Sequence, residues 1–311
     1  MVLHAFHNLF HRQLGKYQLC LGRLPAAISS YRRSRAISEA VGDELLIAQA
    51  LNSLAAALRE AGQADEAIAC AQRSRDLSQK LGDRLQTAKA GNSLRMALLH
   101  KKQYGEAIAL LQDSRDFFLA IGDQRRLAKA STSLGVACRE GGRLDESIQA
   151  FECSLVIERA LKNPHGLAIT LAHLGEVYGD KGWVDKACAA FEEAIPLHEE
   201  LGSRRPLAKS LWEYGKLLLS KGDANKAIEV LQRTLSVQRE LGYDRDEART
   251  LIMLGRTLLN TGQVGEAIRA FADAEDGYKK VRNWGSAKQA HDLWVMAKRA
   301  ARSCGSGGTM C

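Results

Sequence analysis

Residues 41–80 read VGDELLIAQALNSLAAALREAGQADEAIACAQRSRDLSQK, and the chain repeats this pattern at a spacing of forty residues. The tripeptide at its start, Val41-Gly42-Asp43, is predicted to separate two helices. Related tripeptides follow every forty residues, at Leu81-Gly82-Asp83, Ile121-Gly122-Asp123, Leu161-Lys162-Asn163, Leu201-Gly202-Ser203, Leu241-Gly242-Tyr243 and Val281-Arg282-Asn283. A fixed period of about twenty to fifty residues is typical of a solenoid, whose units bury apolar faces only against their neighbours. The sequence therefore predicts a repeat protein with an extended binding surface.

Each period contains two amphipathic stretches separated by a glycine. Apolar residues three and four positions apart form one stripe before the glycine and another after it: Leu51, Leu54 and Leu58, then Ala67, Ile68 and Ala71. This spacing puts each stripe on one face of a helix. Gly62, between the stripes, ends the first helix where a positive φ costs least. Each unit is therefore predicted to be a pair of helices.

Polar residues stand where the helices are expected to begin. Their side-chain oxygens can accept hydrogen bonds from the free backbone N–H groups of the first turn. We therefore expect caps on the first helices at Asp43, Asp83, Asp123, Asn163 and Ser203, and on the second helices at Asp65, Asp145, Asp185 and Asn225.

Small and bulky residues alternate in fixed columns of the repeat. The small columns are Ala55, Gly135, Gly175, Gly215 and Gly255, and Ala27, Ala67, Ala107, Ala187, Ala227 and Ala267. The bulky column is Tyr31, Leu111, Phe151, Phe191, Leu231 and Phe271. Small residues let two helix axes approach closely, and the bulky side chains fill the groove between them. This combination resembles the tetratricopeptide repeat (TPR).

The resemblance implies an all-α fold, a right-handed α-solenoid of seven TPR-like helix pairs. A single solenoid domain over residues 1–303 would contain repeats at about 1–40, 45–80, 85–120, 125–160, 165–200, 205–240 and 245–280, with a capping helix at 284–303 and a flexible tail at 304–311. We expect the third repeat to be the most distorted, because Arg95 stands in a small column and Lys102 replaces the turn glycine. The forty-residue repeat, with a Leu-Gly-Asp-like tripeptide at each boundary, also resembles the repeats of spindle-orientation adaptors and of bacterial signalling ATPases and regulators.

Composition favours a cytoplasmic helical protein without a membrane span. The 311 residues are 46% apolar and 26% charged, carry a formal charge of +8 and contain seven cysteines without CxxC spacing. Free cysteines are typical of a reducing compartment. The chain has no long apolar run and no signal-peptide pattern at its start. We therefore expect no insertion into a membrane.

No motif points to catalysis, a cofactor or a metal. The chain shows no P-loop, GxGxxG, GxSxG or HExxH pattern. His4, His7 and His11 share one side of the first predicted helix with a spacing that could hold a metal, but an amphipathic helix start explains them equally, and no acidic or cysteine ligand is near. We predict that the protein is not an enzyme and binds neither a cofactor nor a metal.

The candidate binding residues lie on the first helix of each pair, because in this family these helices line the concave surface. In the first four repeats they are polar and mainly basic: Arg12, Lys16, Asn52, Arg59, Lys89, Asn92, Lys129 and Arg139. Later repeats add a set of mixed charge: His173, Glu176, Trp212, Lys216, Arg249 and Arg256. A basic groove attracts an acidic peptide or a C-terminal carboxylate.

Two features of this groove allow more than one interpretation. Trp212 has no aromatic counterpart in its column, so it is either an exposed anchor for a partner or a ring that buries itself against Glu176 and Lys216. Arg12 and Lys89 match two positions of the carboxylate clamp of chaperone-binding relatives. The asparagines of that clamp are replaced here, by Lys16 and Ser53.

These observations favour a non-catalytic scaffold or adaptor that binds a peptide segment of a partner protein in its groove. A regulatory module that senses a peptide or another ligand is the alternative. A nucleic-acid-binding solenoid is less favoured, because the regularly spaced stacking aromatics of such proteins are missing.

Overall fold

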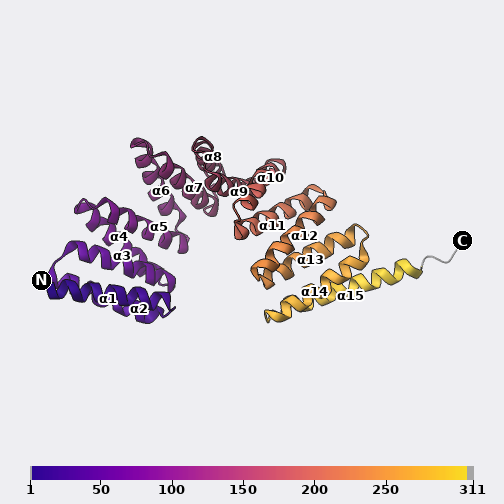
Figure 1. Cartoon of the computed structure of the whole chain (residues 1–311), viewed down its shortest axis with the longest axis horizontal. Coiled ribbons are helices and arrows are strands. Elements are labelled where there is room, and N and C mark those ends of the chain that lie inside the picture. Colours follow the sequence, from indigo (N-terminus) through magenta and orange to yellow (C-terminus); the bar gives the residue numbers. More distant parts are fainter. Residues whose placement is uncertain (1, 307–311) are drawn as a thin grey trace. The chain divides into compact units, whose positions relative to one another are not determined.

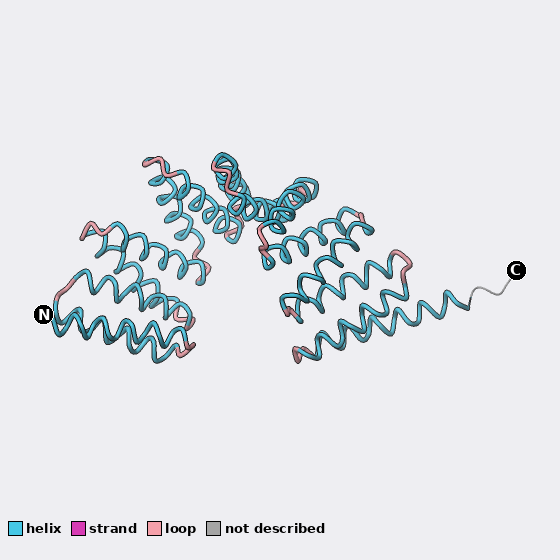
Figure 2. The backbone as a smooth tube through the Cα atoms, viewed as in Figure 1, coloured by secondary structure: helices cyan, strands magenta, loops and turns pink. Residues whose placement is uncertain are grey.

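The computed structural model describes residues 2–306, with the side chains of residues 6–302, and the described residues form fifteen α-helices and no strand (Figure 1). The helices are α1 (Val2–Cys20), α2 (Leu24–Val41), α3 (Glu44–Glu60), α4 (Ala64–Lys80), α5 (Arg84–His100), α6 (Tyr104–Ala120), α7 (Gln124–Glu140), α8 (Leu144–Ala160), α9 (Pro164–Asp180), α10 (Val184–Glu200), α11 (Arg204–Lys221), α12 (Ala224–Leu241), α13 (Asp244–Asn260), α14 (Val264–Lys280) and α15 (Trp284–Ser306). Short turns join them (Figure 2). Within this described part, no helix is both long and apolar enough to cross a membrane.

The helices pack against their neighbours in sequence. The chain divides into two compact units, Met1–Ser147 and Ile148–Cys311, with the boundary inside α8. In the first unit α1 packs on α2, α2 on α3 and α3 on α4; in the second, the same order runs from α9 to α15. This arrangement confirms the predicted TPR-like solenoid of helix pairs that ends in a single capping helix.

The small and bulky columns meet as the sequence predicts. A Cβ added at Gly175 would lie 2.6 Å from the Phe191 ring, and one added at Gly255 would lie 2.7 Å from the Phe271 ring. Both rings are fully buried. Because real Cβ atoms do not approach other atoms so closely, any larger residue at these two glycines would push the helices of the pair apart.

The turn inside each pair needs a residue whose backbone adopts the left-handed conformation, with a positive φ. Glycine supplies this conformation in most repeats, for example Gly62 with φ 77°, but Lys102 adopts it with φ 61° in the third. In that repeat α5 and α6 pack less extensively than the helices of the other described pairs. Arg95 stays half-buried there, and burial lowers its pKa. The third repeat therefore carries the distortion that the sequence predicts.

Side-chain caps begin the first helices of three repeats. The carboxylates of Asp43, Asp83 and Asp123 accept hydrogen bonds from backbone N–H groups three residues on, at 3.0, 2.9 and 3.0 Å. Asn163 and Ser203 make no such bond, so their predicted capping role is wrong. Asn163 instead donates its amide N–H to Glu158 Oε2 at 2.7 Å.

The predicted caps of the second helices are wrong as well, because Asp65, Asp145, Asp185 and Asn225 all lie inside the first turn and not at the N-cap. The N-cap residues are, for example, Gln63 in α4 and Trp183 in α10. A carboxylate still stabilises a helix there, through the helix dipole. Asp185 also accepts a hydrogen bond from Lys221 Nζ at 2.7 Å, which joins successive repeats.

The capping helix buries an alanine stripe. Ala287, Ala290 and Ala297 complete the apolar cluster formed by α13 and α14. Trp284, the first residue of this helix, lies outside the stripe and is 66% exposed. Helix α15 continues to Ser306, so the predicted tail does not begin at residue 304. The remaining tail, residues 307–311, lies outside the described residues.

Removing α15 should destabilise the second unit. A chain that ends after Asn283 exposes the apolar face that the alanine stripe covers, so we expect a lower thermal midpoint and aggregation in size-exclusion chromatography. A chain that ends after Ser306 is the matched control and should behave like the full-length protein. An unchanged midpoint in the shorter chain would show that α15 does not act as a cap.

Lowering the pH should destabilise the fold through His198. This residue of α10 is 2% exposed, and neither ring nitrogen has a hydrogen-bond partner in the described structure. Burial, reinforced by nearby His165, lowers the pKa of His198. The unfolded chain binds the proton near the ordinary value of about 6.5, so stability decreases as the pH falls below it towards the folded pKa.

The measurement is the urea midpoint between about pH 7.5 and pH 5.5, a range that spans the ordinary histidine pKa. His198→Leu should reduce the pH dependence, because the variant has no buried imidazole to protonate. His100→Leu, which removes an exposed histidine of α5, is the control. Equal pH dependence in all three proteins would contradict this role.

Candidate functional site

The predicted groove residues all lie on first helices of the pairs. They are Arg12 and Lys16 on α1, Asn52 and Arg59 on α3, Lys89 and Asn92 on α5, Lys129 and Arg139 on α7, His173 and Glu176 on α9, Trp212 and Lys216 on α11, and Arg249 and Arg256 on α13. The structure therefore places each residue on the helix that the repeat pattern assigns to it. It does not give them all the same environment.

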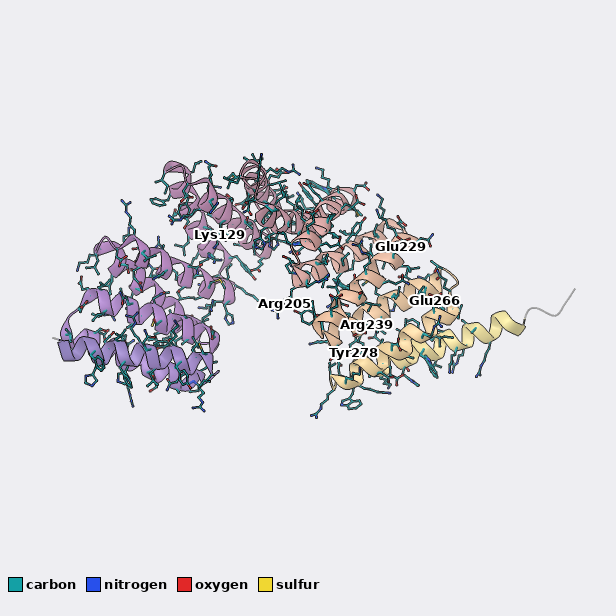
Figure 3. All side chains as sticks on the ribbon, in the orientation of Figure 1. Lys129, Arg205, Glu229, Arg239, Glu266 and Tyr278 are labelled. Atoms are coloured by element: carbon teal, nitrogen blue, oxygen red, sulfur yellow. The ribbon has the colours of Figure 1, made fainter. Side chains whose placement is uncertain are left out.

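In the first unit the exposed cations are the lysines. Lys16, Lys89 and Lys129 (Figure 3) are exposed and have no ion-pair partner within residues 6–302. Arg12 differs, since it is partly buried and donates to Gln49 Oε1. Burial lowers the pKa of Arg12. The lysines are therefore the side chains of this unit most available to an acidic partner.

Two of the remaining predicted residues of the first unit, Arg59 and Asn92, contact local side chains. Arg59 forms an ion pair with Glu60, with 3.6 Å between Nη2 and Oε1. Asn92 accepts a 2.6 Å hydrogen bond from Arg95 Nη2, which brings a guanidinium to this surface that the groove prediction omitted. Asn52 is partly buried, and its Oδ1 lacks a hydrogen-bond partner in the described structure.

His173 and Glu176 belong to the packing between repeats. Glu176 is buried, and its carboxylate accepts from Lys209 Nζ at 2.5 Å and lies 3.9 Å from His173 Nδ1. The His173 ring stacks on Phe151, with 5.4 Å between the ring centroids. These contacts neutralise the carboxylate and hold the imidazole in place.

Three predicted residues of the second unit converge on a cavity of about 580 Å³. It lies between α11, the turn that follows it, the start of α12 and α13, and its lining is Trp212, Leu219, Gly222, Ala224, Arg249, Ile252, Met253, Arg256, Thr257 and Asn260. The lining residues of α13 are mostly three or four apart, so they share one helix face. Lys216 stays outside the lining and pairs with Glu213, with 2.7 Å between Nζ and Oε2.

Trp212 forms part of the wall of this cavity. Its side chain is only 8% exposed, so of the two interpretations of this residue the structure favours the buried ring and not the exposed anchor. The ring packs in the apolar cluster of α13 and α14, and the Arg249 guanidinium carbon lies 4.3 Å from its centroid. Arg249 therefore covers the ring through a cation–π contact. Neither Glu176 nor Lys216 is the main neighbour.

Two arginines give the cavity its charge. Arg249 and Arg256 are exposed, and neither has an ion-pair partner among the described residues. On the same helix, Glu247 is engaged elsewhere, because its Oε1 accepts from Arg239 Nε at 2.6 Å. An apolar wall beside two free guanidinium groups fits an apolar side chain that carries a carboxylate nearby.

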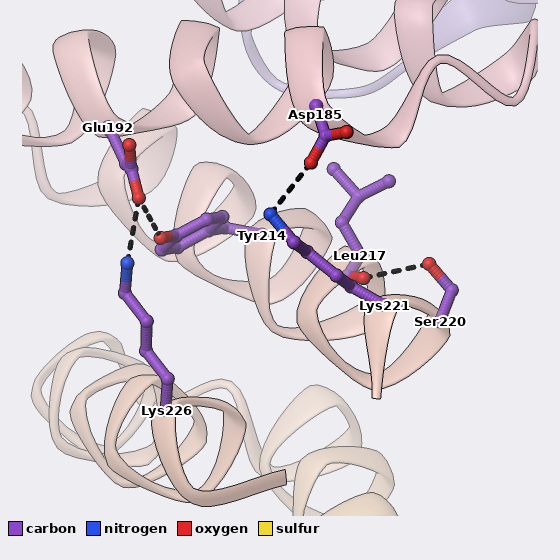
Figure 4. Close-up of polar contacts among 7 residues, drawn as sticks. All are labelled: Asp185, Glu192, Tyr214, Leu217, Ser220, Lys221 and Lys226. Carbon is purple, nitrogen blue, oxygen red and sulfur yellow. Dashed lines mark hydrogen bonds and ion pairs between the residues drawn. The ribbon is translucent and has the colours of Figure 1, made fainter. Parts of the chain in front are cut away.

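A polar cluster holds the helices behind the cavity (Figure 4). Glu192 Oε1 accepts from the Tyr214 hydroxyl at 2.6 Å and from Lys226 Nζ at 2.7 Å. Burial and the Glu192 hydrogen bond raise the pKa of Tyr214 to about 12. The hydrogen bond from Lys226 lowers the pKa of Glu192. The carboxylate stays ionised and joins α10, α11 and α12.

The described side chains contain no group of three metal-binding residues. Of the three histidines that suggested a metal, His4 lies outside the residues whose side chains are described. Sequence analysis also missed part of the cavity: Leu219, Gly222, Ala224, Ile252, Thr257 and Asn260. The helical spacing from Arg249 could have found the residues of α13. Nothing in the sequence pattern marks Gly222 and Ala224 as lining residues, because both lie where the pattern predicts a turn.

The family is defined by its repeat pattern. The model of the tetratricopeptide repeat matches residues 8–80, 46–120, 166–240 and 206–280, which together cover more than half of the chain. The protein therefore belongs to the TPR family. Among curated proteins, none matches the sequence significantly.

Several solved structures share the fold. The apo form of RapI has a TM-score of 0.64 and 16% identity over 95% of this chain and 99% of its own. A signal transduction ATPase with a TPR sensor, from Pyrococcus horikoshii, has a TM-score of 0.72 and 14% identity over 92% of this chain but only 44% of its own. A Rap protein complexed with Competence and Sporulation Factor has a TM-score of 0.54 and 17% identity, over 96% and 76%. Identities this low show likeness of fold alone.

Replacing Trp212 should weaken the fold itself. Trp212→Ala removes a buried ring from the α13–α14 cluster, so we expect a loss of about 3 kcal/mol in the free energy of unfolding. Arg249→Ala removes an exposed side chain and should cost less than about 1 kcal/mol. Urea unfolding followed by circular dichroism measures both. Equal stability of the two variants would contradict the burial of the ring.

Proposed function

We propose that this TPR protein is a non-catalytic scaffold or adaptor that binds a peptide segment of a partner protein. The observation that supports it most directly is the cavity beside α13. There Trp212, Met253 and Leu219 supply apolar surface, while Arg249 and Arg256 supply unpaired positive charge. Preformed apolar cavities with a few charged groups are typical ligand sites.

The proposed ligand is an acidic segment with at least one large apolar side chain. The apolar side chain would contact the wall of the cavity, and a carboxylate would take bidentate hydrogen bonds from a guanidinium group. In the first unit, Lys16, Lys89 and Lys129 are exposed without ion-pair partners inside the described range. They support the same preference for a negatively charged partner.

The composition of the cavity supports a binding role rather than a chemical one. Its lining residues include no histidine, cysteine, lysine or carboxylate. General acid–base and nucleophilic catalysis normally need such groups within hydrogen-bond reach of the substrate. Arginine keeps its proton at all ordinary pH values, so here it serves to bind an anion.

A peptide-sensing regulatory module is the second candidate. The fold resembles that of a Rap protein crystallised with Competence and Sporulation Factor and that of an ATPase with a TPR sensor. A sensor must bind its ligand differently in two conformations. Small-angle scattering with and without a bound peptide separates the candidates, because a scaffold keeps one profile and a sensor changes it.

The binding test uses short fluorescein-labelled peptides that combine aspartate or glutamate with leucine or phenylalanine. Arg249→Ala combined with Arg256→Ala should weaken binding about tenfold or more, because each charge-assisted hydrogen bond contributes about 1.5–3 kcal/mol. Fluorescence anisotropy measures the dissociation constant.

The matched control removes two exposed arginines of the same unit that do not line the cavity, Arg205 and Arg269. This double alanine variant changes the net charge equally and should bind as tightly as the parent. If both double variants lose affinity equally, the effect is one of net charge and the cavity is not the site. If neither loses affinity, the proposed site is wrong.

A further inference from the structure

The outer face of α1 carries an exposed aromatic stripe. Phe6, Phe10 and Tyr17 are 68%, 53% and 64% exposed. Their spacing of four and seven residues places them on one side of the helix. Single exposed apolar residues are common, but three large rings on one helix face indicate a contact surface.

The repeat shows what this face does elsewhere in the chain. The residues forty positions apart in the column of Phe10 are Ala50, Ala90, Ala130, Thr170, Ser210 and Thr250, and all are buried. The column of Tyr17 continues with Ala57, Ala97, Ala137, Val177, Leu217 and Thr257, of which only Leu217 is less than fully buried.

Hydrogen bonds identify what covers the column of Phe10. Thr250 of α13 donates to Gln238 of α12 at 2.8 Å, and Thr170 of α9 lies 3.3 Å from the Ser154 hydroxyl of α8. In both cases the covering element is the second helix of the preceding repeat. The equivalent face of α1 meets no helix among the described residues, and it has aromatic rings where later repeats have small residues.

The charge around the stripe favours an acidic occupant. Residues 1–38 contain no carboxylate. Lys16 precedes Tyr17 in α1 and Arg23 is the N-cap residue of α2; both are exposed and have no ion-pair partner within the described part of the chain. A second copy of α1 would bring like charges together. The exposed Lys288, Arg299 and Arg302 make α15 of a second copy equally unsuitable.

We propose that the outer face of α1 binds an amphipathic helix of another protein. The apolar stripe of that helix would lie on Phe6, Phe10 and Tyr17, and its flanking carboxylates would pair with Lys16 and Arg23. It would occupy the place that the second helix of a preceding repeat occupies on α9 and α13. This surface is separate from the cavity of the second unit and does not rest on the proposed function of that cavity.

The probe is a designed helical peptide with a leucine stripe and glutamate flanks. A second peptide with the same stripe and lysine flanks is the charge control. We expect the full chain to bind the glutamate peptide about tenfold or more tightly than the lysine peptide, because residues 1–38, which include α1, carry only positive charges. Phe10→Ala combined with Tyr17→Ala should weaken binding about tenfold, since aromatic anchors dominate such interfaces.

The alanine pair restores the residues that α3, α5 and α7 carry in these columns, so thermal stability should not change. Phe117→Ala combined with Leu119→Ala removes two other exposed apolar residues of the first unit and should leave binding intact. Lys16→Glu combined with Arg23→Glu should reverse the preference between the two peptides. Removing Arg249 and Arg256 should have no effect, which separates this surface from the cavity.

Three results would overturn the proposal. One is equal affinity of the parent and the Phe10→Ala, Tyr17→Ala variant for the glutamate peptide. Another is concentration-dependent dimerisation in analytical ultracentrifugation that this variant abolishes, which would identify a second copy as the occupant. The third is sedimentation with anionic phosphatidylserine vesicles that depends on the same rings, without peptide binding, which would identify a lipid surface.

Discussion

The close approach of two helices at a glycine is the constraint on which the fold depends. Gly175 and Gly255 leave no room for a Cβ, because the rings of Phe191 and Phe271 occupy that space. This contact fixes the distance between the helices of a pair and therefore the position of the next pair. A forty-residue repeat of such contacts gives each unit its regular stack of helices, with no need for long-range chain contacts.

The cavity follows from the same stacking. Helices α11 and α13 occupy equivalent positions in successive repeats, so they flank a space whose depth depends on the side chains between them. Gly222 and Ala224 are small enough to leave it open, whereas Trp212 and Arg249 close one wall by contacting each other. The link from Glu192 to Tyr214 and Lys226 holds α10, α11 and α12 in register behind it. Positioning by a rigid scaffold lowers the entropy cost of binding a partner.

The sequence predicts the elements well because each one is specified locally. The columns, the turn glycines and the aspartate caps at Asp43, Asp83 and Asp123 depend on residues within one repeat. Predictions failed where the neighbouring repeat decides the outcome. Asn163 precedes α9 and could cap it, but its side-chain amide donates a hydrogen bond to Glu158 at the end of the preceding repeat. The pattern left open whether Trp212 is exposed or buried, because Arg249, which covers the ring, lies on the first helix of the next repeat. A periodic pattern shows which face of a helix is apolar, but it does not show which side chain of a neighbouring repeat covers that face.

The first and last helices, α1 and α15, differ in the residues on the face that no other described helix covers. Helix α15 fully buries its alanines and partly buries Leu293 and Trp294, and its exposed face carries Lys288, Arg299 and Arg302 together with Trp284 and Met296. Helix α1 has Phe6, Phe10 and Tyr17 on the equivalent outward side. Polar outer faces keep terminal repeats from associating. An aromatic outer face has the opposite effect, since removing those rings from water is favourable by roughly 25 cal/mol per Å². The aromatic residues therefore make α1 a surface for continued packing, whereas α15 ends the stack.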